Sequence, residues 1–512
     1  MLRQPGTRSR SGCLECKGRK RRCGEEQPAC RGCVARGLEC SYIYNRHQAQ
    51  FRFRISKGAD PGIPVQKRPH WHFIAFSMQD VETLAQRYQL PQESQSSQDE
   101  PSCLERTLAW LPIVEPDISL PLWPFDHHTE LESQLYQYYL SVLCHARVFQ
   151  DNERNRYRRL VAPHCQTRGP LWHAVISLSA NDRQTKQSHS SVVNYGRLAL
   201  THKLTSLELL RQSVGDSSAA NENIMACLLL CSLEIASGNR PDWIQHAEGG
   251  STILSTFPEV IDPEIWSFAY YYFHLRRTFL RTTEYGQTEY PPSSTPDALL
   301  LLPPPPSTHP RSTTEIQAHM GCSPGLLDLI AEITELTVLK REWRLASASS
   351  LESEEWMLDR ATSIRSRLQP LQQTVPEAGS THLQLSAECF HVAADLLLRL
   401  ACDMPLSQPS LRDTLRALLG LLGRVIHDAL ERQLFPMWPL FVAGCLSIDD
   451  SDRQRVLGYF AILERAWPVS NIPSALEAIQ TVWKSRDLNP GVGDAFDWQC
   501  VIAKMGWKLA LT

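Results

Sequence analysis

Apolar residues at helical spacing dominate the chain from about Thr129 onward. Leu131, Leu135, Tyr138 and Val142 recur at intervals of three and four residues, the pattern that one face of an α-helix produces. The same periodicity marks four further stretches, residues 172–180, 195–210, 326–336 and 411–429. These stretches predict a series of amphipathic helices that bury one face each.

Two segments carry stronger signals of this kind. The run from Ile224 to Ala236 is apolar on nearly every side, which predicts a central helix buried all round. Asp262 followed by Pro263 is typical of a helix N-cap and first turn. Capping boxes are also predicted at Ser451-x-x-Gln454 and Ser474-x-x-Glu477. The helix after Pro263 is expected to bury five side chains: Ile265, Phe268, Tyr272, Leu275 and Phe279.

Proline-rich and serine-rich stretches interrupt the helical pattern. Residues 289–315 hold eight prolines, and proline fixes φ and lacks a donor, so a loop or spacer is expected there. A PxxP-type ligand segment is the alternative reading. Looser stretches follow at 346–353 and 370–382. No convincing alternating strand is present, and the predicted fold class is mostly α, with a large all-α body.

Charge is distributed unevenly over the 512 residues. Residues 1–57 carry 14 Lys and Arg against 4 Asp and Glu, a net charge of +10. The remainder carries 38 against 51, a net charge of −13. A basic head on an acidic body indicates a polyanion-binding arm. A chain of this length is expected to form two or more units.

Six of the 16 cysteines gather in the basic head, in the pattern C-x2-C-x6-C-x6-C-x2-C-x6-C. Between the second and third of them lies Lys17-Gly18-Arg19-Lys20-Arg21-Arg22, with five basic residues of six. Thiolates at this spacing suit zinc, which takes four ligands. Six thiolates fill the eight positions of two zinc ions only if two of them bridge. The six cysteines are Cys13, Cys16, Cys23, Cys30, Cys33 and Cys40.

The other ten cysteines are scattered among apolar residues, where buried free thiols are expected. Met1–Gly12 has no apolar core of a signal peptide. The run Ile224–Leu233 is shorter than the ~20 residues that a membrane span needs. These observations favour a protein of a reducing compartment without a membrane partner, so disulfide pairing of the six cysteines is not expected.

The cysteine intervals resemble those of the fungal Zn2Cys6 binuclear cluster transcription factors. The resemblance covers residues 13–40 and implies that Cys13 and Cys30 bridge two zinc ions. Cys16 and Cys23 would complete one zinc site, and Cys33 and Cys40 the other. It also implies that Arg19 and Lys20 read a CGG triplet in the DNA major groove. Three further basic residues of the strip are expected to contact phosphates: Lys17, Arg21 and Arg22.

The body carries a second resemblance. Trp438-Pro439-Leu440-Phe441-Val442-Ala443-Gly444-Cys445 resembles a signature of the second fungal-specific transcription factor domain family, and Leu171–Ala180 and Trp243–Gly250 resemble two of its other segments. The resemblance implies a helical regulatory domain rather than an enzyme. Trp438 and Phe441 are expected to be core anchors, and Gly444 to permit a close helix approach. His246 is either a ligand contact or a core histidine, and the second reading is favoured.

These features predict four segments. Residues 1–12 form a disordered basic tail, 13–40 the Zn2Cys6 DNA-binding domain, 41–124 a partly disordered linker, and 125–512 the helical regulatory domain. Residues 41–80 show no sustained heptads, although members of this family often dimerise through a coiled coil at this place. Binding as a monomer or as a homodimer therefore stays open.

The sequence thus predicts a nuclear, sequence-specific RNA polymerase II transcription factor that binds double-stranded DNA at CGG half-sites. Family habit favours activation, contact with the transcription machinery, and regulation of one pathway, for instance a metabolic or specialised-metabolite gene cluster. A small-molecule inducer in the body stays open. The alternatives are a repressor, a catalytic body tethered to DNA, and a metal-buffering or redox-sensing thiol module. Motifs of zinc proteases, serine hydrolases and nucleotide-binding enzymes were not found in the sequence.

Overall fold

The computed structural model describes residues 16, 30–36, 129–165, 167–186, 193–238, 242–284, 313–345, 351–376, 380–428, 434–466, 471–488 and 497–512. The chain divides into two units, Met1–Pro69 and His70–Thr512. The second unit is the body, and its described residues are helical with two isolated β-bridges, Glu315 with Thr374 and Gln317 with Cys322. The mostly-α fold class predicted for the body is confirmed.

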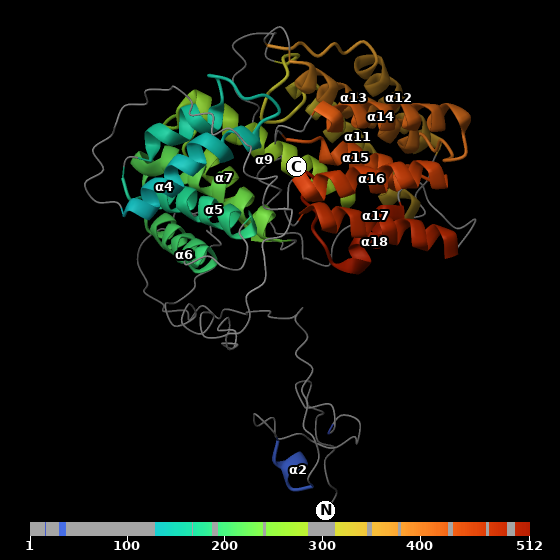
Figure 1. Cartoon of the computed structure of the whole chain (residues 1–512). Coiled ribbons are helices and arrows are strands. Elements are labelled where there is room, and N and C mark those ends of the chain that lie inside the picture. The colour runs from blue at the N-terminus through green and yellow to red at the C-terminus, as the bar shows by residue number, and fades with distance from the viewer. Residues whose placement is uncertain are drawn as a thin grey trace, which may run out of the picture. The chain divides into compact units, whose positions relative to one another are not determined.

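Helices of the body follow one another along the chain and fall into two groups (Figure 1). The first group contains the α-helices α4 (Glu130–Tyr138), α5 (Pro170–Lys186), α6 (Tyr195–Ser213), α7 (Ala220–Ser237), α8 (Asp242–Thr256) and α9 (Pro263–Thr283). Short π and 3-10 turns connect them at η1 (Tyr139–Leu143), η2 (His145–Arg147), η3 (Tyr157–Val161), η4 (Ala162–His164) and η5 (Ser217–Ala219). The second group contains α11 (Pro324–Leu345), α12 (Leu351–Leu368), α13 (Thr381–Ala401), α14 (Pro409–Asp428), α15 (Met437–Leu446), α16 (Asp450–Ala466), α17 (Asn471–Leu488) and α18 (Asp497–Met505).

Two hydrophobic cores correspond to these groups, and α9 belongs to both. Phe268 and Phe273 of α9 lie in the first core, whereas Leu275 and Phe279 lie in the second. Tyr271 packs against both cores. All five side chains predicted to be buried on this helix are at most 4% exposed. The two halves of the body therefore share one long aromatic-rich helix.

Side-chain caps fix where several helices begin. Asp262 accepts hydrogen bonds from the backbone N–H of Glu264 (2.8 Å) and Ile265 (3.2 Å), so the predicted N-cap of α9 is confirmed. Thr129 and Glu132 form a reciprocal capping box at α4, which the sequence pattern had not singled out. Such caps satisfy backbone donors that the first helical turn leaves without partners.

The two capping boxes predicted later in the chain are wrong. Helix α16 begins at Asp450 and α17 at Asn471, so Ser451 and Ser474 lie inside first turns rather than at N-caps. Pro473 is tolerated in a first turn because its missing N–H would have no helical partner there. Helices α12 and α13 also extend into the stretches predicted as interruptions, from Leu351 and Thr381. The proline-rich residues 289–312 lie outside the described residues.

Helix α7 is the central buried helix that its sequence predicts. Residues from Ile224 to Leu233 are at most 4% exposed. By length and composition the stretch Ser217–Ser237 could cross a membrane, and 78% of its most apolar window is buried in the body. The apolar helix is therefore longer than the run Ile224–Leu233 from which its length was judged. Its burial matches that of a core helix in a folded domain.

The tryptophan-rich signature forms α15, at the centre of the second core. Trp438 is fully buried, stacks on Phe279 with ring centroids 4.9 Å apart, and donates from Nε1 to Thr282 Oγ1 at 3.0 Å. Phe441 is 1% exposed. A Cβ on Gly444 would lie 2.7 Å from Ile479 Cδ1 of α17. Both expectations, core anchors and a close helix approach, are confirmed.

His246 of α8 is a core histidine. Its side chain is buried, and Nε2 lies 3.4 Å from Oε1 of Glu234 on α7. Glu234 also pairs with Lys203 at 2.5 Å. Burial raises the pKa of Glu234, but the His246 hydrogen bond and Lys203 together outweigh it and bring the pKa to about 2. The buried carboxylate is thus held charged between two partners, and His246 serves packing.

Most described thiols of the body are buried, and Cys402 and Cys500 are partly exposed. Among the described residues, free cysteines in apolar surroundings include Cys144, Cys227 and Cys231. Burial raises the pKa of Cys144 and Cys227 to about 12 and that of Cys231 to about 11. Because the thiolate is the nucleophile and metal ligand, these groups do not support a redox-sensing role for the body.

Candidate metal centre

The metal centre is built around a single helical turn. Helix α2 (Arg31–Val34) begins directly after Cys30, whose carbonyl accepts hydrogen bonds from the N–H groups of Cys33 (3.0 Å) and Val34 (3.1 Å). A turn of this kind places cysteines three positions apart on the same side of the backbone. The C-x2-C spacing of Cys30 and Cys33 thus brings both side chains to one side of this turn.

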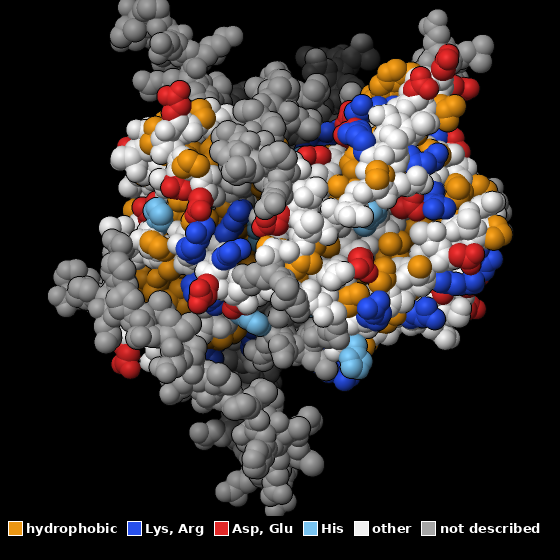
Figure 2. Space-filling view, turned by 90° about the horizontal axis from the view of Figure 1, so that it is seen from above, with side chains coloured by type: hydrophobic (Ala, Val, Ile, Leu, Met, Phe, Trp, Pro, Cys, Tyr) orange, Lys and Arg blue, Asp and Glu red, His pale blue; other side chains and the backbone are white. Residues whose placement is uncertain are grey.

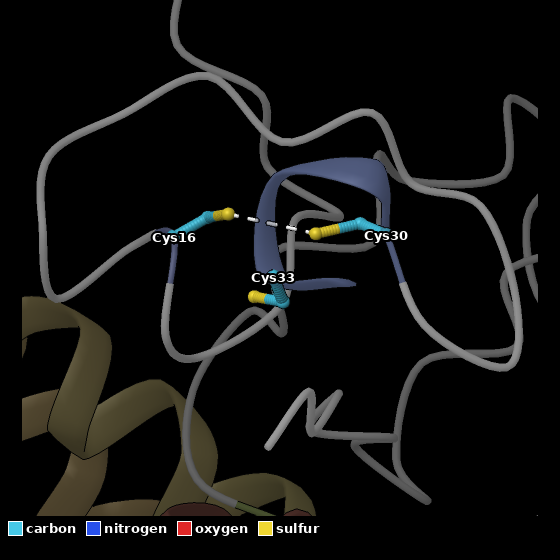
Figure 3. Close-up of side chains that lie close together, drawn as sticks. All are labelled: Cys16, Cys30 and Cys33. Carbon is cyan, nitrogen blue, oxygen red and sulfur yellow. Dashed lines mark hydrogen bonds between the residues drawn. The ribbon is translucent and has the colours of Figure 1, made fainter. Parts of the chain in front are cut away.

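Three sulfurs come together there although one is distant in sequence. Figure 3 shows the side chains of Cys16 and Cys30 pointing toward each other, with Cys33 beside them. The Sγ atoms of Cys16 and Cys30 are 3.7 Å apart, and all three sulfurs lie within 4.8 Å of one another. The residues are 7%, 0% and 1% exposed, respectively.

These distances fit shared metal ligands. A sulfur separation of 3.7 Å is far longer than the ~2.05 Å of a disulfide bond. It is close to the edge of a tetrahedron around zinc, about 3.8 Å for a Zn–S distance of ~2.3 Å. Three buried sulfurs this close together are a donor set of the kind that structural zinc sites use. The residues present therefore fit zinc.

The turn that carries the sulfurs is narrow and basic. A Cβ on Gly32 would lie 3.7 Å from Cys16 Sγ and 3.9 Å from Cys30 Sγ, so the glycine backbone borders both sulfurs. Arg36 donates from Nη1 to the Gly32 carbonyl at 2.9 Å. Sequence reasoning had assigned no role to Gly32 or Arg36.

The other predicted site residues lie outside the described residues. These are the metal-ligand candidates Cys13, Cys23 and Cys40, and the DNA-contact candidates Lys17, Arg19, Lys20, Arg21 and Arg22. The described surface of the body differs from the basic head. On the face shown in Figure 2, Lys and Arg side chains are interspersed with Asp and Glu over both halves.

Comparison with known families decides the class of the protein. Residues 11–49 match the fungal Zn(2)-Cys(6) binuclear cluster domain. Residues 134–512 match the fungal specific transcription factor domain. The chain belongs to this family of fungal transcription factors. The Zn2Cys6 domain of the family binds two zinc ions, and the sulfurs of Cys16, Cys30 and Cys33 form part of the cysteine group in this chain.

A relative extends the similarity over nearly the whole of this fungal transcription factor. The transcriptional activator protein UGA3 of Saccharomyces cerevisiae (strain ATCC 204508 / S288c) is 24% identical over 523 residues, which cover 93% of each chain. No solved structure matches the chain.

Proposed function

We propose that this Zn2Cys6 protein is a nuclear, sequence-specific RNA polymerase II transcription factor that activates its targets from CGG-type half-sites. The cluster of Cys16, Cys30 and Cys33 beside a strip of five basic residues carries the proposal. A metal-organised head can hold basic side chains in fixed positions against DNA. The whole-length similarity to a transcriptional activator supports activation over repression.

All six cysteines of the head are proposed zinc ligands. Cys13 and Cys30 bridge the two ions, Cys16 and Cys23 complete one site, and Cys33 and Cys40 complete the other. Two observations support a bridging Cys30. Its sulfur lies 3.7 Å from that of Cys16, and the three sulfurs all lie within 4.8 Å of one another, so Cys30 is close to a proposed ligand of each site. It is also fully buried, as a thiolate between two ions would be.

The basic strip is the proposed DNA-contact surface. Arg19 and Lys20 donate to guanine O6 and N7 in the major groove, which specifies sequence. Lys17, Arg21 and Arg22 bind phosphates, which adds affinity without specificity. The net charge of +10 on residues 1–57 and of −13 on the remainder supports separate functions for the head and the body. The head binds DNA, and the body contacts the transcription machinery and responds to a small-molecule inducer.

The target genes and the oligomeric state of the transcription factor complete the proposal. A pathway-specific role, for instance in a metabolic or specialised-metabolite gene cluster, follows from the family alone. Residues 41–80 have no sustained heptads, so a homodimer would need the helical body as its interface. The spacing of half-sites distinguishes a dimer, which selects paired triplets, from a monomer, which selects one.

Replacing Lys20 by alanine tests the assignment of base readers and phosphate contacts. We expect Lys20→Ala in the full chain to lower affinity for CGG sites by about 1–3 kcal/mol and to leave affinity for altered triplets nearly unchanged. The measurement is fluorescence anisotropy with paired duplexes that differ only in the triplet.

Lys17→Ala is the matched control, since it removes the same side chain from the same strip. It should weaken binding to both duplexes equally and reduce the salt dependence by about one phosphate contact. If Lys20→Ala also weakens both duplexes equally, Lys20 is a phosphate contact and its assignment as a reader fails.

A further inference from the structure

A cavity of about 160 Å³ lies in the body where its two halves meet. Its walls come from α5, α7 and α9 on one side and from α13, α16 and the C-terminal residues on the other. An engineered protein cavity of about 150 Å³ holds one benzene molecule. Most of the lining is apolar, with contributions that include Leu143, Leu178, Phe279, Phe390, Leu463 and Ile472.

Charged side chains in this lining are mainly cationic. Arg147, Lys186 and Arg276 line the cavity together with one carboxylate, Asp182. Asp182 already accepts from Lys186 Nζ and from the hydroxyl of Tyr138, each at 2.6 Å. Neither guanidinium forms an ion pair with a carboxylate in the part of the chain that the structure describes. The cavity therefore has an excess of positive charge.

Several buried polar atoms of the lining have no protein partner. Three of them are nitrogen atoms: Nε of Arg147, Nε of Arg276 and Nε2 of His319. The other two are oxygen atoms, Oδ1 of Asn471 and Oγ1 of Thr512. His319 and Asn471 are only 7% and 6% exposed. Leaving a buried donor without an acceptor is unfavourable, so the three nitrogen atoms around one cavity point to a ligand that supplies acceptor oxygens.

The neighbouring side chains hold these groups in place. Arg276 lies over the ring of Tyr272, with its guanidinium carbon 3.4 Å from the ring centroid, and donates from Nη1 to the Tyr272 carbonyl at 3.1 Å. His319 packs edge-on against Phe268. Burial, together with Arg156 and Arg276, lowers the pKa of His319 well below its usual value. The imidazole is therefore neutral and can donate from Nε2 in one tautomer.

We infer that this cavity is the inducer site and takes a small organic carboxylate, with its anionic head at Arg147 and Arg276 and its apolar part against the hydrophobic wall. The size of the cavity favours a ligand of about the dimensions of benzoate. This inference rests on the proposed function, because it gives the proposed ligand-regulated activator its ligand class. Since both halves of the body line the cavity, a bound carboxylate stabilises the arrangement in which they meet.

The test compares acids with their neutral amides on the full zinc-loaded chain. Benzoate with benzamide and hexanoate with hexanamide are titrated by calorimetry and by thermal shift. At least one acid should bind about tenfold or more tightly than its amide and raise the melting temperature of the body. If neither acid binds more tightly than its amide, the inference is overturned.

Two arginine variants localise the binding. Arg147→Gln and Arg276→Gln should each weaken binding of the acid about tenfold, toward the level of the amide, while the unliganded melting temperature shows whether the body is still folded. Arg211→Gln, on the exposed face of α6, is the control and should bind the acid as the parent chain does. Acid binding that both cavity variants retain would overturn the site.

DNA binding of the same preparations separates this inference from the proposed function. If the chain binds CGG duplexes but does not distinguish acids from amides, only the carboxylate site is contradicted. A chain that binds the acids but no DNA keeps the cavity assignment and contradicts the transcription factor role of the head.

Discussion

Cys30→Ala is expected to remove both zinc ions from the chain and to abolish specific DNA binding. Cys30 is the fully buried sulfur that lies close to both Cys16 and Cys33. A bridging thiolate serves two ions, so its loss leaves neither with four ligands. Zinc binding supplies about 10–16 kcal/mol to the folding of small zinc domains, far more than so short a segment gains from packing. Zinc content by mass spectrometry and duplex binding provide the measurement.

The body serves as an internal control for this variant. It is a separate compact unit, so its thermal transition should stay unchanged when the head loses its metal. Cys402→Ala removes a partly exposed thiol of the body and should leave both the zinc content and DNA binding intact. A Cys30→Ala chain that keeps one zinc ion and full affinity for CGG sites would contradict the bridged assignment.

Trp438→Ala is expected to destabilise the body by about 3–5 kcal/mol, the cost typical of large-to-small changes at buried aromatic residues. Trp438 is fully buried and packs against both Phe279 and Phe390, whose ring centroids lie 4.9 and 6.2 Å away. The change also removes the donor to Thr282 Oγ1 and leaves a cavity beside α9. Chemical denaturation followed by circular dichroism measures the loss.

Trp356→Ala is the matched control, because this side chain on α12 is 46% exposed. Surface substitutions are usually within about 0.5 kcal/mol of neutral, so the control should unfold close to the parent. If the two variants unfold at the same denaturant concentration, α15 is not the structural centre of the second core.

The parts of the fold that the sequence predicts are those set by local rules. Helical periodicity and the Asp262-Pro263 cap depend on residues a few positions apart, and α7 and α9 formed as expected. The capping boxes predicted at Ser451 and Ser474 were wrong because they, too, rested on a local pattern alone. A capping motif matches wherever a serine precedes Gln or Glu by three, whereas the true helix start depends on the chain before it.

The metal centre and the cavity differ in how far the sequence reveals them. The cysteine intervals predict a zinc cluster, because its ligands must be cysteines at fixed spacing. The cavity is assembled from Arg147, Arg276 and His319, which are far apart in sequence and individually ordinary. The unsatisfied nitrogen atoms of these side chains depend on tertiary packing, which no local pattern encodes. For the cavity, the sequence offered only the expectation, from the family resemblance, that the body binds a small-molecule inducer.

Particular residues bear on the two alternative hypotheses, a catalytic body and a thiol module. In the described lining of the cavity, Ser232 is hydrogen-bonded to the hydroxyl of Tyr272 at 2.5 Å and Asp182 is paired with Lys186, and neither contact favours a catalytic body. A metal-buffering or redox-sensing module of the head cysteines would need no basic strip, whereas five of residues 17–22 are basic. Binding groups for DNA and for an anion remain the better-supported chemistry.

Selection of binding sites from random double-stranded DNA by the full zinc-loaded chain tests the central claim most directly. The account predicts enrichment of CGG triplets, in pairs of fixed spacing for a dimer or singly for a monomer, and loss of that enrichment when zinc is chelated. Enrichment of no sequence, or of a motif without CGG that survives chelation, would contradict it.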